Sequence, residues 1–270
     1  MKVWVLGSGS SGNAVLLESD GLRILVDAGF GPRTLRARLK LAGVDPNSII
    51  ACILTHDHSD HVSGAAKAVR RWGWPLFATA GTAAGLDVGD ALLTTFPAGA
   101  TLRFGTLEIE TFATPHDAAE PIGVAVSSLT TGYRAGICYD IGHASANVRA
   151  LCRDVDLLVL EANHDEGMLW AGPYPPWLCQ RIAGDTGHLS NRAAGQLVRD
   201  TVTRRLGHLV LAHLSAHNNT ETIATRTVRS ALRGTAFRGT LSAASQREVV
   251  GPFMPRGVKH DSPLQYALGL

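Results

Sequence analysis

Residues 55–61, with the sequence THDHSDH, place three histidines and two aspartates within seven positions. An apolar run at residues 49–54 precedes them and is typical of a buried strand, and residues 62–70 then favour a helix. A loop at the end of a buried strand is a position where a rigid scaffold holds reactive groups. The stretch is therefore the first candidate for chemistry in this chain.

The spacing of these side chains indicates metal binding. His56 and His58 are two residues apart, so in an extended segment they leave the same face and can share one ion. Asp60 and His61 follow where the chain turns into the helix, and they can face a second ion. Imidazole and carboxylate ligands suit zinc, manganese or iron, and the lack of thiolates argues against a purely structural zinc site. A polar loop with solvated histidines would need five ligand-type residues to coincide by chance.

The stretch resembles the HxHxDH signature of the metallo-β-lactamase superfamily. The resemblance implies an α/β fold, a four-layer αββα sandwich, holding two divalent metal ions per chain (Zn²⁺ or Mn²⁺, with Fe as an alternative). It also implies a third histidine for the first ion, a bridging aspartate and a last histidine for the second ion. The implied ligands are His56, His58, His116, Asp140, Asp60, His61 and His213.

The expected strands deliver these downstream ligands. His116 follows two strands predicted within residues 102–112, and Asp140 follows a hairpin of residues 122–129 and 133–139. His213 follows an apolar strand at 206–211. Asp27, after a strand at 22–26, is expected to cap or orient the metal loop rather than to bind metal, and His143 to open a helix. The last helix is predicted to run from about residue 217 to about 233.

Composition predicts one ordinary globular domain. The chain has 270 residues, of which 45% are hydrophobic and 18% charged, and we expect a domain at 1–250 followed by a loosely held Pro/Gly-marked tail at 251–270. The four cysteines form no CxxC pair, which favours buried free thiols in a reducing compartment. With neither a signal-peptide core nor a membrane-length apolar run, a cytoplasmic protein is expected.

Charge is unevenly distributed along the chain. Residues 181–250 hold ten arginines, no lysine and four acids, a balance of +6, whereas the whole chain carries only +2. The remainder is therefore at −4. A basic C-terminal third fits a phosphate-rich partner, and a solvated arginine-rich surface accounts for it equally well.

Further motifs resemble one branch of the superfamily, the YycJ/WalJ-type DNA exonucleases. They are GSGSSGN at residues 7–13, HDAAEP at 116–121, EANHDEGML at 161–169, RIAGDTGHLSN at 181–191 and LAHLSAHNN at 211–219. The similarity spans roughly residues 1–230. Ile141 stands where the group usually has Thr, and Thr114-Pro115 where it more often has Val-Ser, but neither change removes a ligand. The resemblance implies a 5′–3′ exonuclease that acts on duplex DNA ends in DNA repair.

The GHLS element at residues 187–190 also resembles the Gly-His-Ser-Thr element of tRNA 3′-processing nucleases. This resemblance makes His188 a catalytic candidate that stabilises the scissile phosphate or protonates the leaving oxygen, oriented by Glu161 or Asp185. A helix N-terminal residue satisfied by backbone is the alternative.

Candidate substrate contacts are Ser10 and Asn13, in a Gly/Ser loop whose N–H groups could cradle phosphate, and His164. That loop lacks the lysine of a P-loop, and a strand rather than a helix follows it, so we interpret it as a tight turn near the site, with a phosphate contact as the alternative.

The predicted reaction is phosphodiester hydrolysis by a water that two metals activate, with Asp60 beside the attacking oxygen. An RNA nuclease, or a phosphodiesterase or esterase for a small molecule, would use the same site. A non-catalytic nucleic-acid-binding scaffold is a third alternative, and the intact ligand set argues against it.

Overall fold

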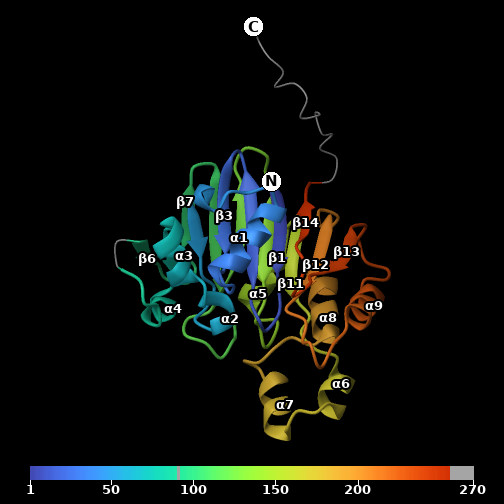
Figure 1. The fold of residues 1–270 in the computed structure, drawn as a ribbon. Helices are drawn as coiled ribbons and strands as arrows, with labels where there is room; N and C mark the ends of the chain where they lie inside the picture. Colours follow the sequence, from blue (N-terminus) through green and yellow to red (C-terminus); the bar gives the residue numbers. More distant parts are fainter. Residues whose placement is uncertain (90–91, 256–270) are drawn as a thin grey trace.

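The computed structural model describes residues 1–89 and 92–255, and in them the strands form two seven-stranded sheets that face each other (Figure 1). The first sheet has the order β14 (Val250–Phe253), β1 (Lys2–Gly7), β2 (Ala14–Ser19), β3 (Leu22–Val26), β4 (Ala51–Ile53), β5 (Leu76–Ala78), β6 (Leu93–Thr95). The second has the order β13 (Thr240–Ala243), β12 (His208–Ala212), β11 (Leu157–Glu161), β10 (Arg134–Cys138), β9 (Ile122–Ser128), β8 (Leu107–Ala113), β7 (Thr101–Phe104).

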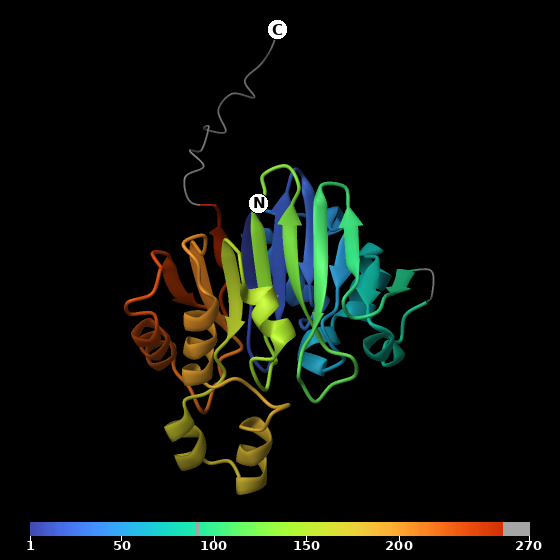
Figure 2. The ribbon, with the colours of Figure 1, turned by 180° about the vertical axis from the view of Figure 1, so that it is seen from behind.

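Helices cover the outer face of each sheet, which confirms the predicted αββα sandwich. On the first sheet lie α1 and α3, and on the second lie α5, α8 and α9 (Figures 1 and 2). The helices are α1 (Pro32–Leu41), α2 (Ser59–Val62), α3 (Ala65–Trp72), α4 (Ala80–Ala84), α5 (Ala146–Cys152), α6 (Glu166–Ala171), α7 (Pro176–Ile182), α8 (Asn191–Thr201) and α9 (Glu221–Ala231), with a short 3₁₀ turn η1 (Pro46–Ser48).

Strand alternation divides the apolar side chains among three layers. In β1, Val3 and Val5 point between the sheets, whereas Trp4 and Leu6 pack beneath α1 and α3. Strand β11 divides its side chains in the same way, with Val159 inside and the leucines on either side under the outer helices. Strands buried on both faces read as continuous apolar runs, which is why the sequence predicts them well.

Strand direction brings the reactive loops to one end of the sandwich. In the first sheet β3 and β4 run parallel, and β1 runs the same way because it and β3 are both antiparallel to β2. In the second sheet β10, β11 and β12 are parallel, and β8 shares their direction because it and β10 are both antiparallel to β9. The loops that follow these strands therefore meet at the end that carries α2 (Figure 1).

Several predicted boundaries are wrong. Residues 251–253 belong to β14 and pair with β1, so they are not part of a loose tail; Pro252 is tolerated because β14 is an edge strand. Residues 256–270 of that predicted tail lie outside the described residues. The last helix begins at Glu221, with the Thr220 side chain capping Ile223 N, because Asn219 is engaged in tertiary hydrogen bonds.

His143 was expected to open a helix, but α5 begins three residues later behind Ser145. Its ring Nδ1 lies instead 2.8 Å from the carbonyl oxygen of Asp185.

All four cysteines are buried free thiols. No helix within residues 1–89 and 92–255 combines the length and apolar character that crossing a membrane requires.

Candidate metal centre

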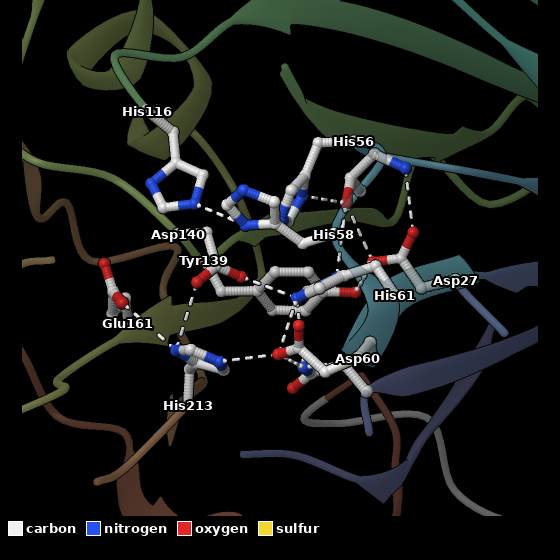
Figure 3. A network of polar contacts seen from close by, with 12 residues as sticks. Asp27, His56, His58, Asp60, His61, His116, Tyr139, Asp140, Glu161 and His213 are labelled. Atoms are coloured by element: carbon white, nitrogen blue, oxygen red, sulfur yellow. Dashed lines mark hydrogen bonds and ion pairs between the residues drawn. The ribbon is translucent and has the colours of Figure 1, made fainter. Parts of the chain in front are cut away.

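Three histidines converge at the end of the sandwich from two different sheets. His56 and His58 lie on the loop after β4, and His116 lies on the loop after β8 (Figure 3). One nitrogen from each ring lies within 4.8 Å of the others. His58 Nδ1 and His116 Nε2 are 3.2 Å apart, and the buried Nε2 of His56 has no hydrogen-bond partner.

A second group lies beside the first. Asp60 and His61 stand in α2, and His213 follows β12. Asp60 Oδ2 lies 3.2 Å from His213 Nε2 and 3.4 Å from His61 Nε2. The short helix α2 thus faces the second sheet with two side chains from successive positions.

Asp140, at the end of β10, lies between the two groups. Its Oδ2 is 2.8 Å from His61 Nε2, and its Oδ1 is 3.1 Å from His213 Nδ1 and 3.2 Å from His188 Nδ1. It also belongs to a cluster with His56 and His61. This buried carboxylate therefore has the placement that the sequence predicted for a bridging ligand.

The donor set fits divalent cations. Ligand atoms of a tetrahedral zinc ion lie about 3.4 Å apart, close to the separation of the His58 and His116 nitrogens. Asp27, Asp140 and Glu161 are all buried in the same region, and Asp60 is only partly exposed. Such a concentration of negative charge away from water is stabilised by cations nearby, and a bound metal ion would give the Nε2 of His56 the partner that it lacks.

Asp27 orients this centre from behind. Its Oδ2 lies 2.7 Å from His61 Nδ1 and accepts hydrogen bonds from the hydroxyls of Tyr139 and Thr55, while Oδ1 accepts from Thr55 N. The contact with Nδ1 turns the Nε2 of His61 toward Asp140. A carboxylate behind a ligating histidine fixes its tautomer and raises its basicity, which agrees with the orienting role predicted for Asp27.

Glu161, at the end of β11, holds His188. Its Oε1 lies 2.7 Å from His188 Nδ1, and its Oε2 accepts from the backbone N–H groups of Ile141 and Leu189. Burial raises the pKa of Glu161, but the charge and hydrogen bond of His188 outweigh burial and leave its pKa at about 2. Of the two candidates for orienting His188, Glu161 therefore makes the contact, and Asp185 does not.

The two groups of histidines differ in their electrostatics. Burial, reinforced by neighbouring imidazoles, holds the pKa of His56 well below its ordinary value, so the ring is in the neutral form that binds metals. Burial also disfavours charge on His61 and His213, but Asp140 outweighs it and raises both pKa values, that of His213 to about 9. Asp140 is thus the carboxylate that favours positive charge on both histidines, with Asp27 adding to it at His61 and Asp60 at His213.

Three residues of the centre have left-handed backbone conformations. Asp27, Asp140 and His213 have φ values of 62°, 55° and 53°. Residues other than glycine seldom adopt this region, and such backbone conformations cluster at functional sites. Asp27 and His213 directly follow β3 and β12, and Tyr139 alone separates Asp140 from β10, so each left-handed residue stands where the chain leaves its strand.

The candidate substrate contacts lie at different depths. Asn13 is buried, and its Nδ2 is 3.2 Å from Asp60 Oδ2 and 3.0 Å from His61 Nε2. Ser10 is exposed on the same loop. His164 is almost fully buried, with its Nδ1 lacking a hydrogen-bond partner. The structure therefore brings Asn13 to the metal loop and leaves Ser10 at the surface; the substrate roles of all three residues stay predictions.

Sequence reasoning missed three polar residues that support the centre. Tyr139 and Thr55 bind Asp27, and Ser8 Oγ accepts from His213 N at 2.9 Å. The first two directly precede Asp140 and His56, and adjacency to a predicted ligand is the signal that could have found them.

The chain resembles known proteins in both sequence and structure. A family model described as "Beta-lactamase superfamily domain" matches residues 22–233. The chain is 31% identical over 261 residues to the exodeoxyribonuclease YycJ of Bacillus anthracis, covering 95% of this chain and 97% of that protein. It is 32% identical over 234 residues to the exodeoxyribonuclease WalJ of Streptococcus pneumoniae, covering 84% and 86%. The metallo-β-lactamase fold protein YhfI of Bacillus subtilis superimposes with a TM-score of 0.68 at 19% identity, covering 92% and 98%.

Proposed function

Because the chain belongs to the β-lactamase superfamily, in its YycJ/WalJ-type branch, we propose that it is a 5′–3′ exonuclease acting on duplex DNA in DNA repair. Superfamily membership and the clustered side chains make it a metal-dependent hydrolase. The observation that carries the proposal is the convergence of seven His and Asp side chains from both sheets at one end of the sandwich. Two relatives named as exodeoxyribonucleases, similar over most of their length, support DNA as the substrate.

Two ions are proposed, Zn²⁺ or Mn²⁺ with Fe as an alternative. His56, His58 and His116 would hold one, and Asp60, His61 and His213 the other, with Asp140 between them. Bound ions would lower the pKa of water and neutralise charge on the phosphate oxygens.

His188 is proposed to protonate the leaving oxygen. Its Nδ1 is held by Glu161 and Asp140, so Nε2 is the nitrogen that can reach a substrate. Burial disfavours the charged ring, but Glu161 and Asp140 outweigh burial and raise the pKa of His188 well above its ordinary value, so the ring carries a proton to donate. As water attacks phosphorus and the opposite P–O bond breaks, that proton passes to the departing oxygen.

Asp60 is proposed to assist the attacking water. Its carboxylate is partly exposed, unlike the buried Asp140, and so it can meet a water that enters with the substrate. Asn13 Nδ2, 3.2 Å from Asp60 Oδ2, fixes the orientation of that carboxylate.

The proposal is tested by digestion of end-labelled linear duplex DNA, with and without added Mn²⁺, using His58→Ala as the blank. Progressive release of nucleotides from one labelled end supports the exonuclease and gives its polarity. Absence of release from a wild type shown to hold two metals contradicts DNA as the substrate. A small phosphodiester or RNA would then be the next substrate to assay, because the same site serves both chemistries.

A further inference from the structure

A pocket of about 300 Å³ opens directly beside the candidate metal centre. Its inner wall includes His58 and His188, and its outer wall comes from α7 and the residue that leads into it. Helices α6 and α7 project from the same end of the sandwich that carries α2 (Figure 1). The full lining is His58, Asp117, Tyr174, Leu178, Arg181, Ile182, Gly187 and His188.

The outer wall is one face of a helix. Leu178, Arg181 and Ile182 are spaced three and four residues apart, and such residues share a face of α7. Tyr174 precedes the helix, and its ring packs edge-on against His217, with ring centres 5.7 Å apart. The wall therefore presents an aromatic ring and aliphatic side chains with a guanidinium among them.

The polar side of the pocket is tied to the metal loop. Arg181 Nε donates to Asp117 Oδ2 at 2.7 Å, and Asp117 directly follows His116. Asp117 N donates to Thr186 O, and His116 Nδ1 lies 3.1 Å from Gly187 O. These contacts fix the pocket relative to the candidate metal ligands, so a group in the pocket has a defined position relative to the reacting phosphate.

We propose, building on the function argued above, that this pocket binds the base of a nucleotide attached to the scissile phosphate. A phosphate bound at the metal centre would lie next to the wall formed by His58 and His188, so an adjoining nucleoside would be the next part of the strand to meet the pocket. Tyr174 and Leu178 contact the base, and the Arg181 cation lies at its edge or near the next phosphate. Stacking on an aromatic ring accepts every base, which suits an enzyme that digests any sequence.

The test combines enzyme variants with substrates that lack one base. Wild type and Tyr174→Ala digest a labelled duplex that is either intact or carries an abasic site at the terminal or the second nucleotide. Removal of one of those two bases lowers wild-type kcat/KM by about 5- to 150-fold, the range that corresponds to base–aromatic stacking. Tyr174→Ala shows a similar loss on the intact strand and no additional loss when that base is missing.

Two further variants serve as controls. Tyr174→Phe keeps the ring and therefore restores the dependence on the base that Tyr174→Ala loses. Trp177→Ala removes an exposed aromatic side chain of α7 that does not line the pocket, and it leaves the dependence on the base unchanged. Calorimetric binding of a deoxynucleoside monophosphate, compared with deoxyribose 5-phosphate, gives a readout without turnover; tighter binding of the nucleotide is lost in Tyr174→Ala.

The outcomes separate this proposal from the proposed function. Equal digestion of intact and abasic strands by wild type, or equal losses in Tyr174→Ala on both, overturns the base pocket and leaves the nuclease standing. Failure of the metal-loaded wild type to digest any DNA overturns both.

Discussion

The proposed proton donation by His188 can be tested by changing the leaving group of the substrate. If its ring protonates the leaving oxygen, His188→Ala slows DNA hydrolysis by about 10²- to 10⁴-fold. The same variant slows hydrolysis of a diester with a nitrophenolate leaving group much less, because that oxygen departs without a proton. The measurement is kcat on both substrates, with metal content determined for each protein. Equal losses on the two substrates, or loss of a metal ion, would refute the role of proton donor.

Glu161 is expected to act through His188. In the Glu161→Gln variant, the remaining oxygen accepts from the backbone N–H groups of Ile141 and Leu189, and the amide NH₂ group then faces the imidazole in place of Oε1. We therefore expect kcat to fall about 10- to 100-fold. In a His188→Ala background the same replacement should add much less, and what remains reflects the second contact of Glu161 Oε1, at 3.3 Å from His213 Nδ1. A matched control is Glu166→Gln, because Glu166 pairs at the surface with Arg192 and its loss changes little. Additive losses in the double variant would show that Glu161 does not act through the histidine.

At the residue scale the sequence predicted which side chains meet, and it named Asp27 and Glu161 as supports, but it did not predict the other residues that support them. His56 and His58 are two apart on one loop, so local geometry alone brings them together. Tyr139 and Asp27 are 112 positions apart and meet only because β3 and β10 face each other across the sandwich. Asn13 was predicted to contact substrate, but its contacts with Asp60 and His61 depend on a loop packing that no local pattern reveals.

At the element scale, the loops after β1 and β3 together hold α2 in place. Asn13 N and Ala28 N donate to the carbonyl oxygens of Asp60 and His61, each at 2.8 Å. Gly29 allows this approach, since a Cβ there would lie only 1.7 Å from the backbone oxygen of Asp60.

Gly29→Ala therefore tests whether the position of α2 sets the metal site. We expect a loss of about 1–3 kcal/mol in the free energy of unfolding and weaker metal binding, because backbone must move to admit the methyl group. Gly31→Ala is the matched control two residues on, where a Cβ meets nothing within 4 Å. Denaturant unfolding and metal titration of both variants give the comparison. Unchanged metal affinity in Gly29→Ala would contradict the coupling.

Some helices and strands were predictable from the sequence pattern, and others were not. Long apolar runs such as β11 were recognisable because both of their faces are buried. Strand β14 was missed because Pro252 and Gly251 are typical of a loop, and only pairing with β1 makes the segment a strand. The start of α9 was placed too early because Asn218 and Asn219 resemble helix caps, whereas Thr220 takes that position.

At the scale of the whole molecule, neither of the two sheets supplies the candidate metal centre alone. His56, His58, Asp60 and His61 come from the first sheet, and His116, Asp140 and His213 come from the second. The fold class followed from a resemblance carried by a few motifs, and superfamily membership together with the two facing sheets confirms it.

Several arginines of the basic C-terminal third lie close together on the surface formed by α8 and α9. Arg192 of α8, Arg226 of α9 and Arg233 line one surface hollow, and Arg233 also borders a second hollow with Arg229. On a DNA-bound enzyme these guanidinium groups would neutralise phosphates along the duplex and release counterions.

The double variant Arg226→Gln/Arg233→Gln measures that contribution. For each phosphate contact removed, the slope of log K for duplex DNA against log salt becomes shallower by about 0.9, so we expect a change of about 2. Turnover of a small diester should stay at the wild-type rate, because the metal centre is untouched. Arg33→Gln/Arg36→Gln on α1 carries the same charge change on the opposite outer face and should leave the slope unaltered. Equal slopes in the two double variants would mean that the arginines of α9 form a solvated surface, and that duplex DNA is held by other residues.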